Sequence, residues 1–585
     1  MPITRLGPLF QREVFSMPNP LRVRAVRGAV CAALVTVLLG LTQASPIVSE
    51  AEAAVAPASI ALTVDAGAGR KPISPYIYGL NFAKEAFANE IDLPVRRWGG
   101  NHTTRYNWQG NFLNHGSDWF FHNNINYDPY SSNTETADQW VQQNKRTGAE
   151  SLISVPIIGH VAKDGDPNTC GFQVPIYGAQ DDVDNESGYP DCGNGLVGGA
   201  PITGNPLDTS LAVTPAFVGD WVNHLKTTHG AANSGGVKFY ALDNEPELWS
   251  ETHRDAHPSA QTYDELLTRS LAYGAALKTA DAGAKVFGYA SFRWTGFRYS
   301  RYDTETAAHF PDYATHGNQY QVEWYLQQMR NYEQTNGARL LDYLDLHFYP
   351  QNGVDLSTAG DAAKQALRLR SVRALWDPTY VDESWIAGAG PDGGIVRLIP
   401  RMRDWVNADY PGTRLAITEY NWGGLEDING ALAQADILGI FGPDATLGYD
   451  QFETLPGAFA FRLYRNYDGS GGKFGDVSVS ASSADQSQLA IYAAQRFDDG
   501  ALTLVVINKT GSPLTGDVAL AGFAPAAAAE VYRYSDANLN AIVREVDQPV
   551  GAGGFSAPFP ANSITLVVIP PSVPPTKVYL PLIQR

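Results

Sequence analysis

The sequence predicts an α/β fold: a (β/α)₈ TIM barrel joined to a β-sandwich that is built from the C-terminal region and an N-terminal strand. Two observations lead to this prediction. From about residue 77 to 464, short β-branched or aromatic runs alternate with longer helical patterns, and several of these runs are continuously apolar. Such runs are typical of parallel strands that are covered on both faces. After about residue 470, short strands alternate with turns rich in Gly, Asp, Asn and Pro, which is typical of an antiparallel sandwich.

Eight apolar runs are predicted to be the strands of the barrel. They are IYGLNF (77–82), PVRRWGG (94–100), ESLISVPIIG (150–159), VKFYALDNEP (237–246), KVFGYASF (285–292), YLDLHFYP (343–350), RLAITEYN (414–421) and GAFAFRLY (457–464). Helices are predicted between them at 137–148, 217–230, 263–280 and 320–334. An open doubly wound sheet is the alternative, and it is disfavoured because no Gly-rich phosphate turn follows the first strand.

The sandwich strands are predicted at 488–496, 501–510, 528–536 and 563–571, and the strand-like stretch 58–68 is expected to pair with them. The resulting domain organisation runs along the chain in five parts. They are a signal peptide and leader (1–54), an N-terminal strand joining the sandwich (55–76), the barrel (77–468), the sandwich (469–570) and a proline-rich linker with a C-terminal tail (571–585).

The composition limits the kinds of partner that the protein can bind. The chain has 61 acidic and 42 basic residues and a net charge of −19. A surface of this charge repels nucleic acid, so a neutral substrate is the simpler interpretation.

The N-terminal region has the organisation of a secretory signal. Arg22, Arg24 and Arg27 precede the apolar stretch 28–41, which is shorter than the ~20 residues of a membrane-spanning helix. We therefore expect a secreted protein without a membrane span after signal removal; an uncleaved anchor is the alternative. The tail is interpreted as a disordered end, with a surface-retention signal as the alternative.

Two of the three cysteines remain after signal removal. Cys170 and Cys192 lie in a loop-rich stretch of an exported chain, which favours a Cys170–Cys192 disulfide over two free thiols. No CxxC or Cys/His pattern accompanies them, so the sequence does not support a zinc site.

The ends of three predicted strands are unusually polar. The fourth strand ends in Asp243-Asn244-Glu245-Pro246, the sixth in His347-Phe348-Tyr349, and the seventh in Thr418-Glu419-Tyr420. In a parallel barrel these ends meet at one face, so Glu245 and Glu419 are predicted to face one pocket. Opposed carboxylates are what hydrolysis of a glycosidic bond requires, one to protonate the leaving oxygen and one to attack.

The two glutamates then need different environments. Glu245 is expected in a water-poor setting that keeps it protonated, and Glu419 beside donors that keep it ionised. Tyr349 and Arg97 are the predicted donors, and Asn244 is predicted to hold a sugar hydroxyl. Further acids at the fourth strand, Asp243 and Glu247, are interpreted as supporting or rim groups.

Aromatic residues at strand ends suit a flat, neutral ligand such as a sugar ring. Those predicted to line the site are Trp98, Trp108, Trp249, Trp294 and Trp422. Metal binding is not predicted: His253 and His257 have helical ligand spacing but lack an HExxH pattern. Asp181, Asp184 and Glu186 form an acidic loop that we interpret as solvated, with Ca²⁺ binding as the alternative.

Several blocks together resemble glycoside hydrolase family 44. They are RRWGGNHTTRYNWQGN (96–111), KFYALDNEPELWSETHRDAHP (238–258), DYLDLHFYPQ (342–351), ITEYNWGG (417–424) and FRLYRNYDG (461–469). The resemblance implies a retaining endo-β-1,4-glucanase acting on cellulose derivatives, xyloglucan and related β-glucans. It implies Glu245 as acid/base, Glu419 as nucleophile and Asn244 as a substrate contact. His347, at the end of the sixth strand, is predicted to be a substrate-binding or supporting residue.

The resemblance implies no cofactor for catalysis; family members can carry structural calcium, for which we assign no ligands. The expected partner is a β-glucan polysaccharide, and a monomer is expected. A β-mannanase or xylanase on the same barrel is an alternative, and so is a non-catalytic polysaccharide-binding protein.

Overall fold

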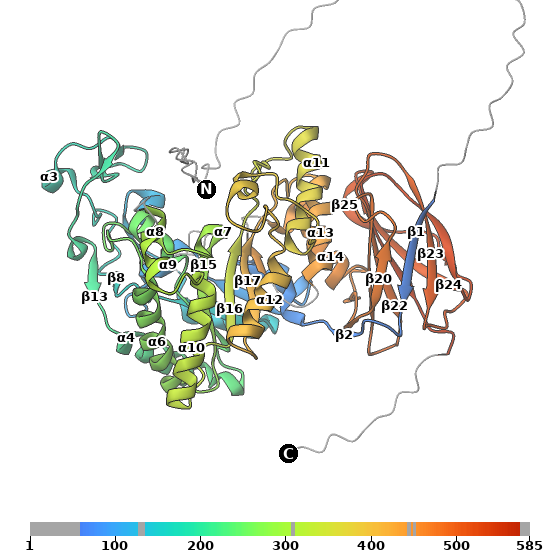
Figure 1. The fold of residues 1–585 in the computed structure, drawn as a ribbon, viewed down its shortest axis with the longest axis horizontal. Helices are drawn as coiled ribbons and strands as arrows, with labels where there is room; N and C mark the ends of the chain where they lie inside the picture. The colour runs from blue at the N-terminus through green and yellow to red at the C-terminus, as the bar shows by residue number, and fades with distance from the viewer. Residues whose placement is uncertain (1–58, 127–134, 306–309, 442–445, 449–451, 574–585) are drawn as a thin grey trace, which may run out of the picture. The chain divides into compact units, whose positions relative to one another are not determined.

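The computed structural model describes residues 59–126, 135–305, 310–441, 446–448 and 452–573 (Figure 1). The predicted signal peptide and most of the C-terminal tail lie outside this range. Among the described residues, no helix is both long and apolar enough to cross a bilayer.

Eight parallel strands form the central sheet. They are β3 (Gly79–Asn81), β4 (Val95–Trp98), β7 (Glu150–Val155), β14 (Phe239–Leu242), β15 (Lys285–Phe292), β16 (Tyr343–Phe348), β17 (Arg414–Tyr420) and β18 (Thr446–Gly448). Their order is β17-β16-β15-β14-β7-β4-β3-β18, and the two edge strands β17 and β18 also contact each other. The sheet therefore nearly closes, which confirms the barrel and excludes the open sheet.

The prediction of the eighth strand, at residues 457–464, is wrong. Residues 457–464 lie in helix α14 (Pro456–Arg465), and the eighth strand position is taken by β18, which pairs with β3. Pro456 stands in the first turn, where proline favours a helix start. Phe459 and Arg462 are the two residues of this helix that are not buried, and they lie three positions apart, a helical rather than an alternating spacing. The apolar run was therefore a helix face.

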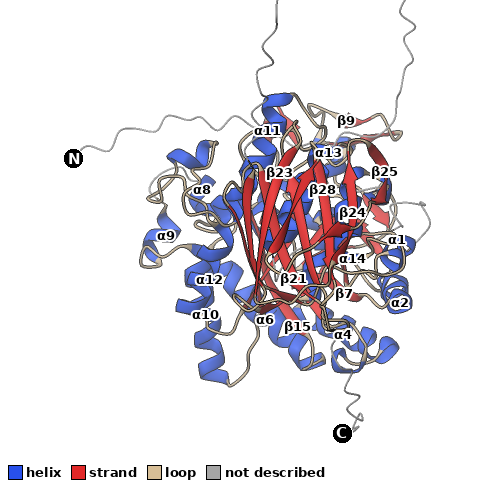
Figure 2. Cartoon of the chain, turned by 90° about the vertical axis from the view of Figure 1, so that its right-hand side faces the viewer, coloured by secondary structure: helices blue, strands red, loops and turns tan. Residues whose placement is uncertain are grey.

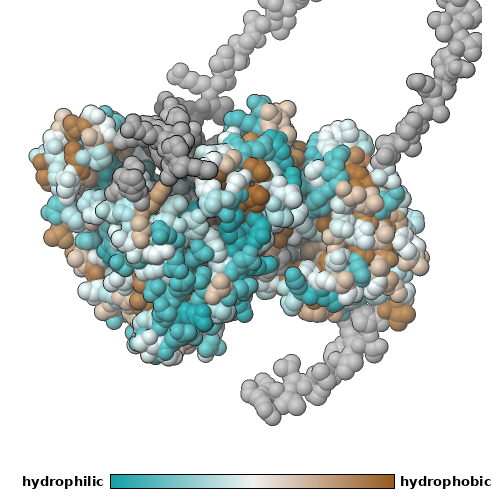
Figure 3. Space-filling model, in the orientation of Figure 1, coloured by the Kyte–Doolittle hydropathy of each residue, from teal (hydrophilic) through white to brown (hydrophobic). Residues whose placement is uncertain are grey.

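The other predicted helices are present, as α2 (Ala137–Thr147), α4 (Pro215–His229), α6 (Tyr263–Ala280) and α10 (Gln321–Asn336). Thr136 and Gln139 form a capping box at the start of α2, and Gly148 ends that helix in the left-handed region. Helix α10 buries Val322, Tyr325, Leu326 and Met329 on one face, and the surface around it is largely hydrophilic (Figure 3).

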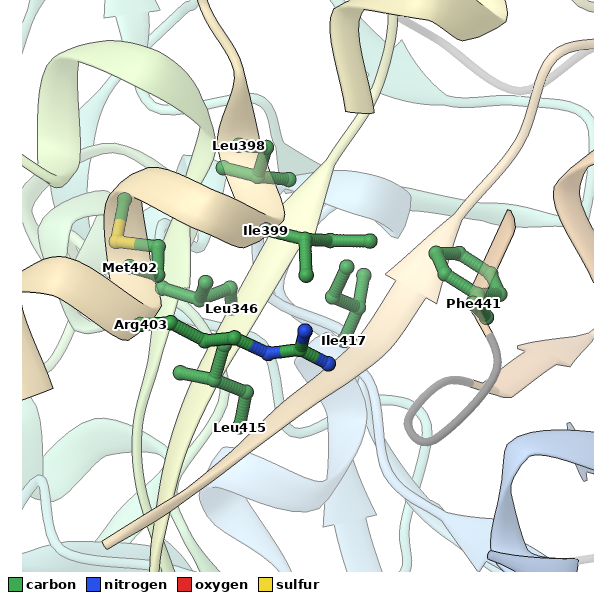
Figure 4. A pocket seen from close by; sticks show the side chains of 8 residues that line it. All are labelled: Leu346, Leu398, Ile399, Met402, Arg403, Leu415, Ile417 and Phe441. Atoms are coloured by element: carbon green, nitrogen blue, oxygen red, sulfur yellow. The ribbon is translucent and has the colours of Figure 1, made fainter. Parts of the chain in front are cut away.

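Apolar packing holds the helices on the outside of the barrel. Leu346 of β16 and Ile417 of β17 meet Leu398 and Met402 of helix α12 (Leu398–Asp409) (Figure 4). Leu344 and Leu346 therefore face outward, and the alternation of a strand turns Asp345 and His347 inward.

The barrel interior changes from apolar to charged along the strands. Seven residues form a buried cluster inside the barrel: Val95, Leu152, Phe239, Ala241, Phe287, Tyr343 and Ala416. Arg97 follows Val95 by two positions on β4, and Asp345 follows Tyr343 by two positions on β16. Both charged residues therefore share the inward face of their strands. The apolar floor thus supports a polar layer at the carboxyl ends of the strands.

The sandwich includes the predicted N-terminal strand. Strand β1 (Ile60–Asp65) lies between β20 (Ser480–Ser483) and β23 (Leu514–Ala521), and β27 (Gly554–Phe559) completes that sheet. The second sheet has the order β2-β19-β21-β22-β28-β24-β25, and the sandwich strands are drawn in red at the centre of Figure 2. Its strands are β2 (Lys71–Pro72), β19 (Val477–Ser478), β21 (Leu489–Gln495), β22 (Leu502–Asn508), β24 (Ala528–Ser535), β25 (Asn538–Arg544) and β28 (Ser563–Ile569).

A buried ion pair connects the barrel helices to the sandwich. Asp436, in helix α13 (Ile428–Phe441), pairs with Lys509, and the two side chains are 2% and 5% exposed. The hydroxyl of Tyr492 on β21 donates to the same carboxylate at 2.6 Å. Both charges are satisfied away from water, so removing either partner leaves the other buried and unpaired.

We predict that Lys509→Ala lowers the free energy of unfolding by about 3–5 kcal/mol, because Asp436 keeps its buried charge without its cation. The matched control is Lys473→Ala, which breaks an ion pair with Asp92 whose side chains are 42% and 61% exposed. The control should cost less than about 1 kcal/mol. Urea denaturation of both variants checks this, and equal shifts in the two midpoints would contradict it.

Candidate active site

The backbone at the end of β14 is unusual. Asp243 and Glu245 both have positive φ angles, 68° and 48°, a region that non-glycine residues seldom occupy. The Asp243 carboxylate stabilises this turn, since it accepts hydrogen bonds from Thr104 Oγ1 at 2.6 Å and from the backbone N–H groups of Ile157 and Ile158 at 2.7 and 3.1 Å. The turn directs Glu245 toward the barrel axis.

A β-bulge in β17 places two consecutive side chains inside the barrel. Leu346 pairs with Ile417, but His347 pairs with Glu419, so Thr418 is the extra residue. Thr418 faces the barrel interior, as Ala416 two positions earlier does. The bulge turns the next side chain, Glu419, to the interior as well. Both side chains then reach interior partners.

His347 lies between the two predicted catalytic glutamates. Its Nδ1 atom is 2.8 Å from Glu245 Oε1 and 3.6 Å from Glu419 Oε2. One oxygen of each carboxylate and a ring nitrogen of His347 all lie within 4.8 Å of one another. Carboxyl groups this close fall near the ~5–5.5 Å separation of retaining glycosidases and outside the ~6.5–9.5 Å of inverting ones.

Two further donors hold Glu419. Arg97 Nη1 lies 2.8 Å from Glu419 Oε1, and the Tyr349 hydroxyl donates to Oε2 at 2.9 Å. Arg97 also donates to Asn244 Oδ1 at 2.8 Å, and Asn244 in turn donates to Asn101 at 3.0 Å. The structure therefore brings together Glu245, Glu419, Asn244, Arg97, His347 and Tyr349 as the sequence predicted.

The two glutamates have opposite pKa shifts. Burial raises the pKa of Glu245, against the lowering effect of its hydrogen bond to His347. Burial acts in the same direction on Glu419, but the charges of His347 and Arg97 and the hydrogen bonds from Arg97 and Tyr349 outweigh it and lower that pKa to about 2. Burial lowers the pKa of His347, but the charge of Glu419 and the hydrogen bond between His347 Nδ1 and the Glu245 carboxylate outweigh it and raise that pKa. One carboxyl can thus stay protonated while the other is ionised.

A divalent cation is a poor fit to this cluster. Glu245, His347 and Glu419 offer three ligand atoms, but Arg97 already pairs with Glu419 at 2.8 Å. Its positive charge opposes a second cation at the same carboxylate.

The prediction is wrong for four of the five sugar-facing tryptophans. Trp98 is 1% exposed and packs against Tyr106 and Trp221, because strand alternation turns it outward when Arg97 faces inward. Trp249 is fully buried against His257, and Trp108 stacks on His224 of α4. These rings pack between barrel strands and helices, and so does Trp294, beside Phe297.

Trp422 follows β17 and is also buried, at 3% exposed, rather than open to a sugar ring. Its ring lies 5.8 Å from that of Phe348, and its indole N–H donates to Ser371 Oγ at 3.1 Å. Its carbonyl accepts from the buried Arg368, which also binds the carbonyls of Asp355, Thr358 and Ala359.

The other acids at the end of β14 are buried rather than at the rim. Glu247 accepts a hydrogen bond from Ser291 Oγ at 2.6 Å and one from the backbone of Phe292, and burial raises its pKa to about 7. Of the two alternatives for Asp243 and Glu247, supporting group or rim group, their burial and hydrogen bonds agree with the first and exclude the second.

The remaining predicted features lie away from the strand ends. Cys170 and Cys192 form the predicted disulfide. His257 bonds to Glu265 at 2.8 Å. In the acidic loop, Asp181 accepts from the backbone of Gly198 and Gly199, and Asp184 from that of Ser187, so these carboxylates already have protein donors.

Sequence reasoning missed two interior residues, Asp345 and Thr418. Thr418 donates to Asp345 at 2.7 Å and lies 3.1 Å from His347 Nε2. The alternation of β16 was a signal for Asp345, because it shares a strand face with His347. The bulge that turns both Thr418 and Glu419 inward has no comparable signal.

Comparisons with known proteins agree with the geometry. The family model of glycoside hydrolase family 44 matches residues 112–352. Endoglucanase A of Paenibacillus lautus is 31% identical over 508 residues, which cover 83% of this chain and 68% of that protein. Beta-mannanase/endoglucanase A of Caldicellulosiruptor saccharolyticus is 33% identical over 77% of this chain, and the chain spans 34% of its length.

Two solved structures are similar along most of their length. CelM2, a bifunctional glucanase-xylanase protein from a metagenome library, is 39% identical with a TM-score of 0.83, over 88% of this chain and 99% of that one. A Paenibacillus polymyxa xyloglucanase from glycoside hydrolase family 44 is 30% identical with a TM-score of 0.73, over 87% and 99% of the two chains. This chain belongs to glycoside hydrolase family 44.

Proposed function

We propose that the protein is a retaining endo-β-1,4-glucanase that hydrolyses cellulose derivatives, xyloglucan and related β-glucans. The single observation that carries the proposal is the pair Glu245 and Glu419, with oxygens within 4.8 Å of each other and opposite pKa shifts. The family to which the chain belongs supports the same reaction, as do the names of its similar relatives.

The geometry leads to a double displacement. The Glu419 carboxylate attacks the anomeric carbon while Glu245 gives its proton to the leaving glycosidic oxygen. Glu245, now ionised, removes a proton from water, whose oxygen attacks the same carbon and releases Glu419. Each displacement inverts the anomeric centre, so the product keeps the β configuration. Asn244, oriented by Arg97 and Asn101, is placed to bind a sugar hydroxyl.

A β-mannanase or a xylanase is the second candidate. Two observations favour this second candidate. One relative is named beta-mannanase/endoglucanase A, and one similar solved structure is described as a bifunctional glucanase-xylanase. Product analysis on xyloglucan, carboxymethyl cellulose, mannan and xylan separates the candidates. Cleavage of mannan or xylan alone would overturn the glucanase proposal.

We predict that Glu245→Gln and Glu419→Gln each reduce release of reducing ends from xyloglucan by about 10²- to 10⁴-fold, because each removes a group that acts on the reacting atoms. The control is Glu251→Gln, an exposed glutamate paired with Arg301, which should keep wild-type activity. Proton NMR of the first product should show the β anomer. If wild type binds glucan but releases no reducing ends, the protein is a polysaccharide-binding protein instead.

We predict that Arg97→Met shifts the acidic limb of the kcat/KM profile to higher pH. Arg97 lowers the pKa of Glu419 by its charge and its hydrogen bond, so removing it destabilises the carboxylate and raises that pKa. Tyr349→Phe removes one hydrogen bond without a charge and should shift the limb in the same direction by less. An acidic limb that stays in place in both variants would contradict the assignment of Glu419 as the ionised nucleophile.

We further propose that the protein is secreted. The Cys170–Cys192 disulfide supports this, because structural disulfides persist in oxidising compartments. N-terminal sequencing of the protein recovered from the culture medium should show that the apolar stretch 28–41 has been removed. Recovery only from the cell, with the N-terminus intact, would contradict the proposal.

A further inference from the structure

A chain of hydrogen bonds runs from the barrel interior to the proposed acid. The Thr418 hydroxyl donates to Asp345 Oδ1 at 2.7 Å, His347 Nε2 lies 3.1 Å from Thr418 Oγ1, and His347 Nδ1 lies 2.8 Å from Glu245 Oε1. Asp345 and His347 are fully buried, and Thr418 is 1% exposed. All four side chains are thus shielded from water.

The direction of these bonds fixes the tautomer of His347. A hydroxyl has one proton, and Thr418 gives it to the Asp345 carboxylate. Thr418 Oγ1 can then only accept from His347, so Nε2 carries a proton. In the neutral ring, Nδ1 is therefore an acceptor, which can receive a hydrogen bond from a protonated Glu245 but not from an ionised one.

We propose that Asp345 and Thr418 are positioning residues that hold His347 in the Nε2–H tautomer and so keep the transferable proton between His347 Nδ1 and Glu245. The proposal rests on the proposed function, in which Glu245 protonates the leaving oxygen. The bulge in β17 makes the arrangement available, since it turns Thr418 and Glu419 to the same side.

The burial of Asp345 supports a role beyond stability. Its Oδ2 atom has no hydrogen-bond partner among the described residues, and a buried carboxyl that is only partly satisfied costs folding free energy. Four titratable or charged groups face His347. They are Asp345 on the same strand, Arg97 on β4, Glu419 on β17 and Glu245 after β14. Burial raises the pKa of Asp345, while the charges of His347 and Arg97 and the hydrogen bond from Thr418 favour its ionised form. An ionised Asp345 favours the protonated ring, so Asp345→Asn should make the shared proton leave at lower pH.

The test compares leaving groups. In Asp345→Asn and Thr418→Val, kcat/KM on xyloglucan should fall about 10- to 100-fold, because its poor leaving group needs the acid. On 2,4-dinitrophenyl β-cellobioside, whose leaving group departs without protonation, kcat/KM should stay within about threefold of wild type. The alkaline limb of Asp345→Asn on xyloglucan should move to lower pH. Thr418→Ser, which keeps the hydroxyl, should have near wild-type kcat/KM on xyloglucan as well as on the dinitrophenyl substrate.

Equal losses on the two substrates, or a failure of Thr418→Ser to restore activity, would overturn the proposal, because a merely structural role does not distinguish leaving groups. Nitrogen-15 NMR of protein labelled at its histidines reports the tautomer of His347 independently of activity. The His347 signals are identified as those that disappear in His347→Asn. Above the pKa of His347, where the ring is neutral, wild type should show the Nε2–H tautomer, and an Nδ1–H tautomer there would also overturn the proposal. If wild type hydrolyses neither substrate, the proposed function fails, while the NMR signal still reports the tautomer.

Discussion

The interaction on which the site depends is the pairing of Glu419 with two cations in a water-poor barrel end. A carboxylate buried alone would take up a proton, as burial favours for Glu245. The charges of His347 and Arg97 and the hydrogen bonds from Arg97 and Tyr349 reverse this preference at Glu419, whereas at Glu245 burial outweighs the hydrogen bond with His347. The two glutamates therefore differ in protonation largely because the Arg97 guanidinium lies 2.8 Å from Glu419 and His347 and Tyr349 add to its effect there.

Several local features of the fold serve this placement. Strand alternation turns Arg97 inward above the apolar floor, the left-handed turn held by Asp243 brings Glu245 to the axis, and the bulge in β17 does the same for Glu419. Each feature is costly or unusual by itself. They are tolerated because the packed strands and helices around them leave no alternative conformation of lower energy.

The polar strand ends could be predicted from sequence, because the carboxyl ends of parallel strands share one face and their residues can be read directly. Trp98 was misassigned even though it neighbours Arg97, since adjacent strand residues face opposite sides. The apolar run at 457–464 has the composition of a strand, but it forms helix α14. Thr418 was beyond prediction for a different reason: a bulge is defined by pairing with a second strand, and no local pattern encodes that register.

The position of β1 in the sandwich has a consequence for the timing of folding. Ile60 pairs with Gly516, 456 positions later in the chain. At a synthesis rate of roughly 5–20 residues per second, the partner strand emerges about 20–90 seconds after β1. Throughout that interval β1 has an unsatisfied strand edge, which is a site of aggregation in nascent chains. The barrel can form around its own strands as they appear, whereas the sandwich must wait for nearly the whole chain, so its closure is expected to be the last and slowest step of assembly.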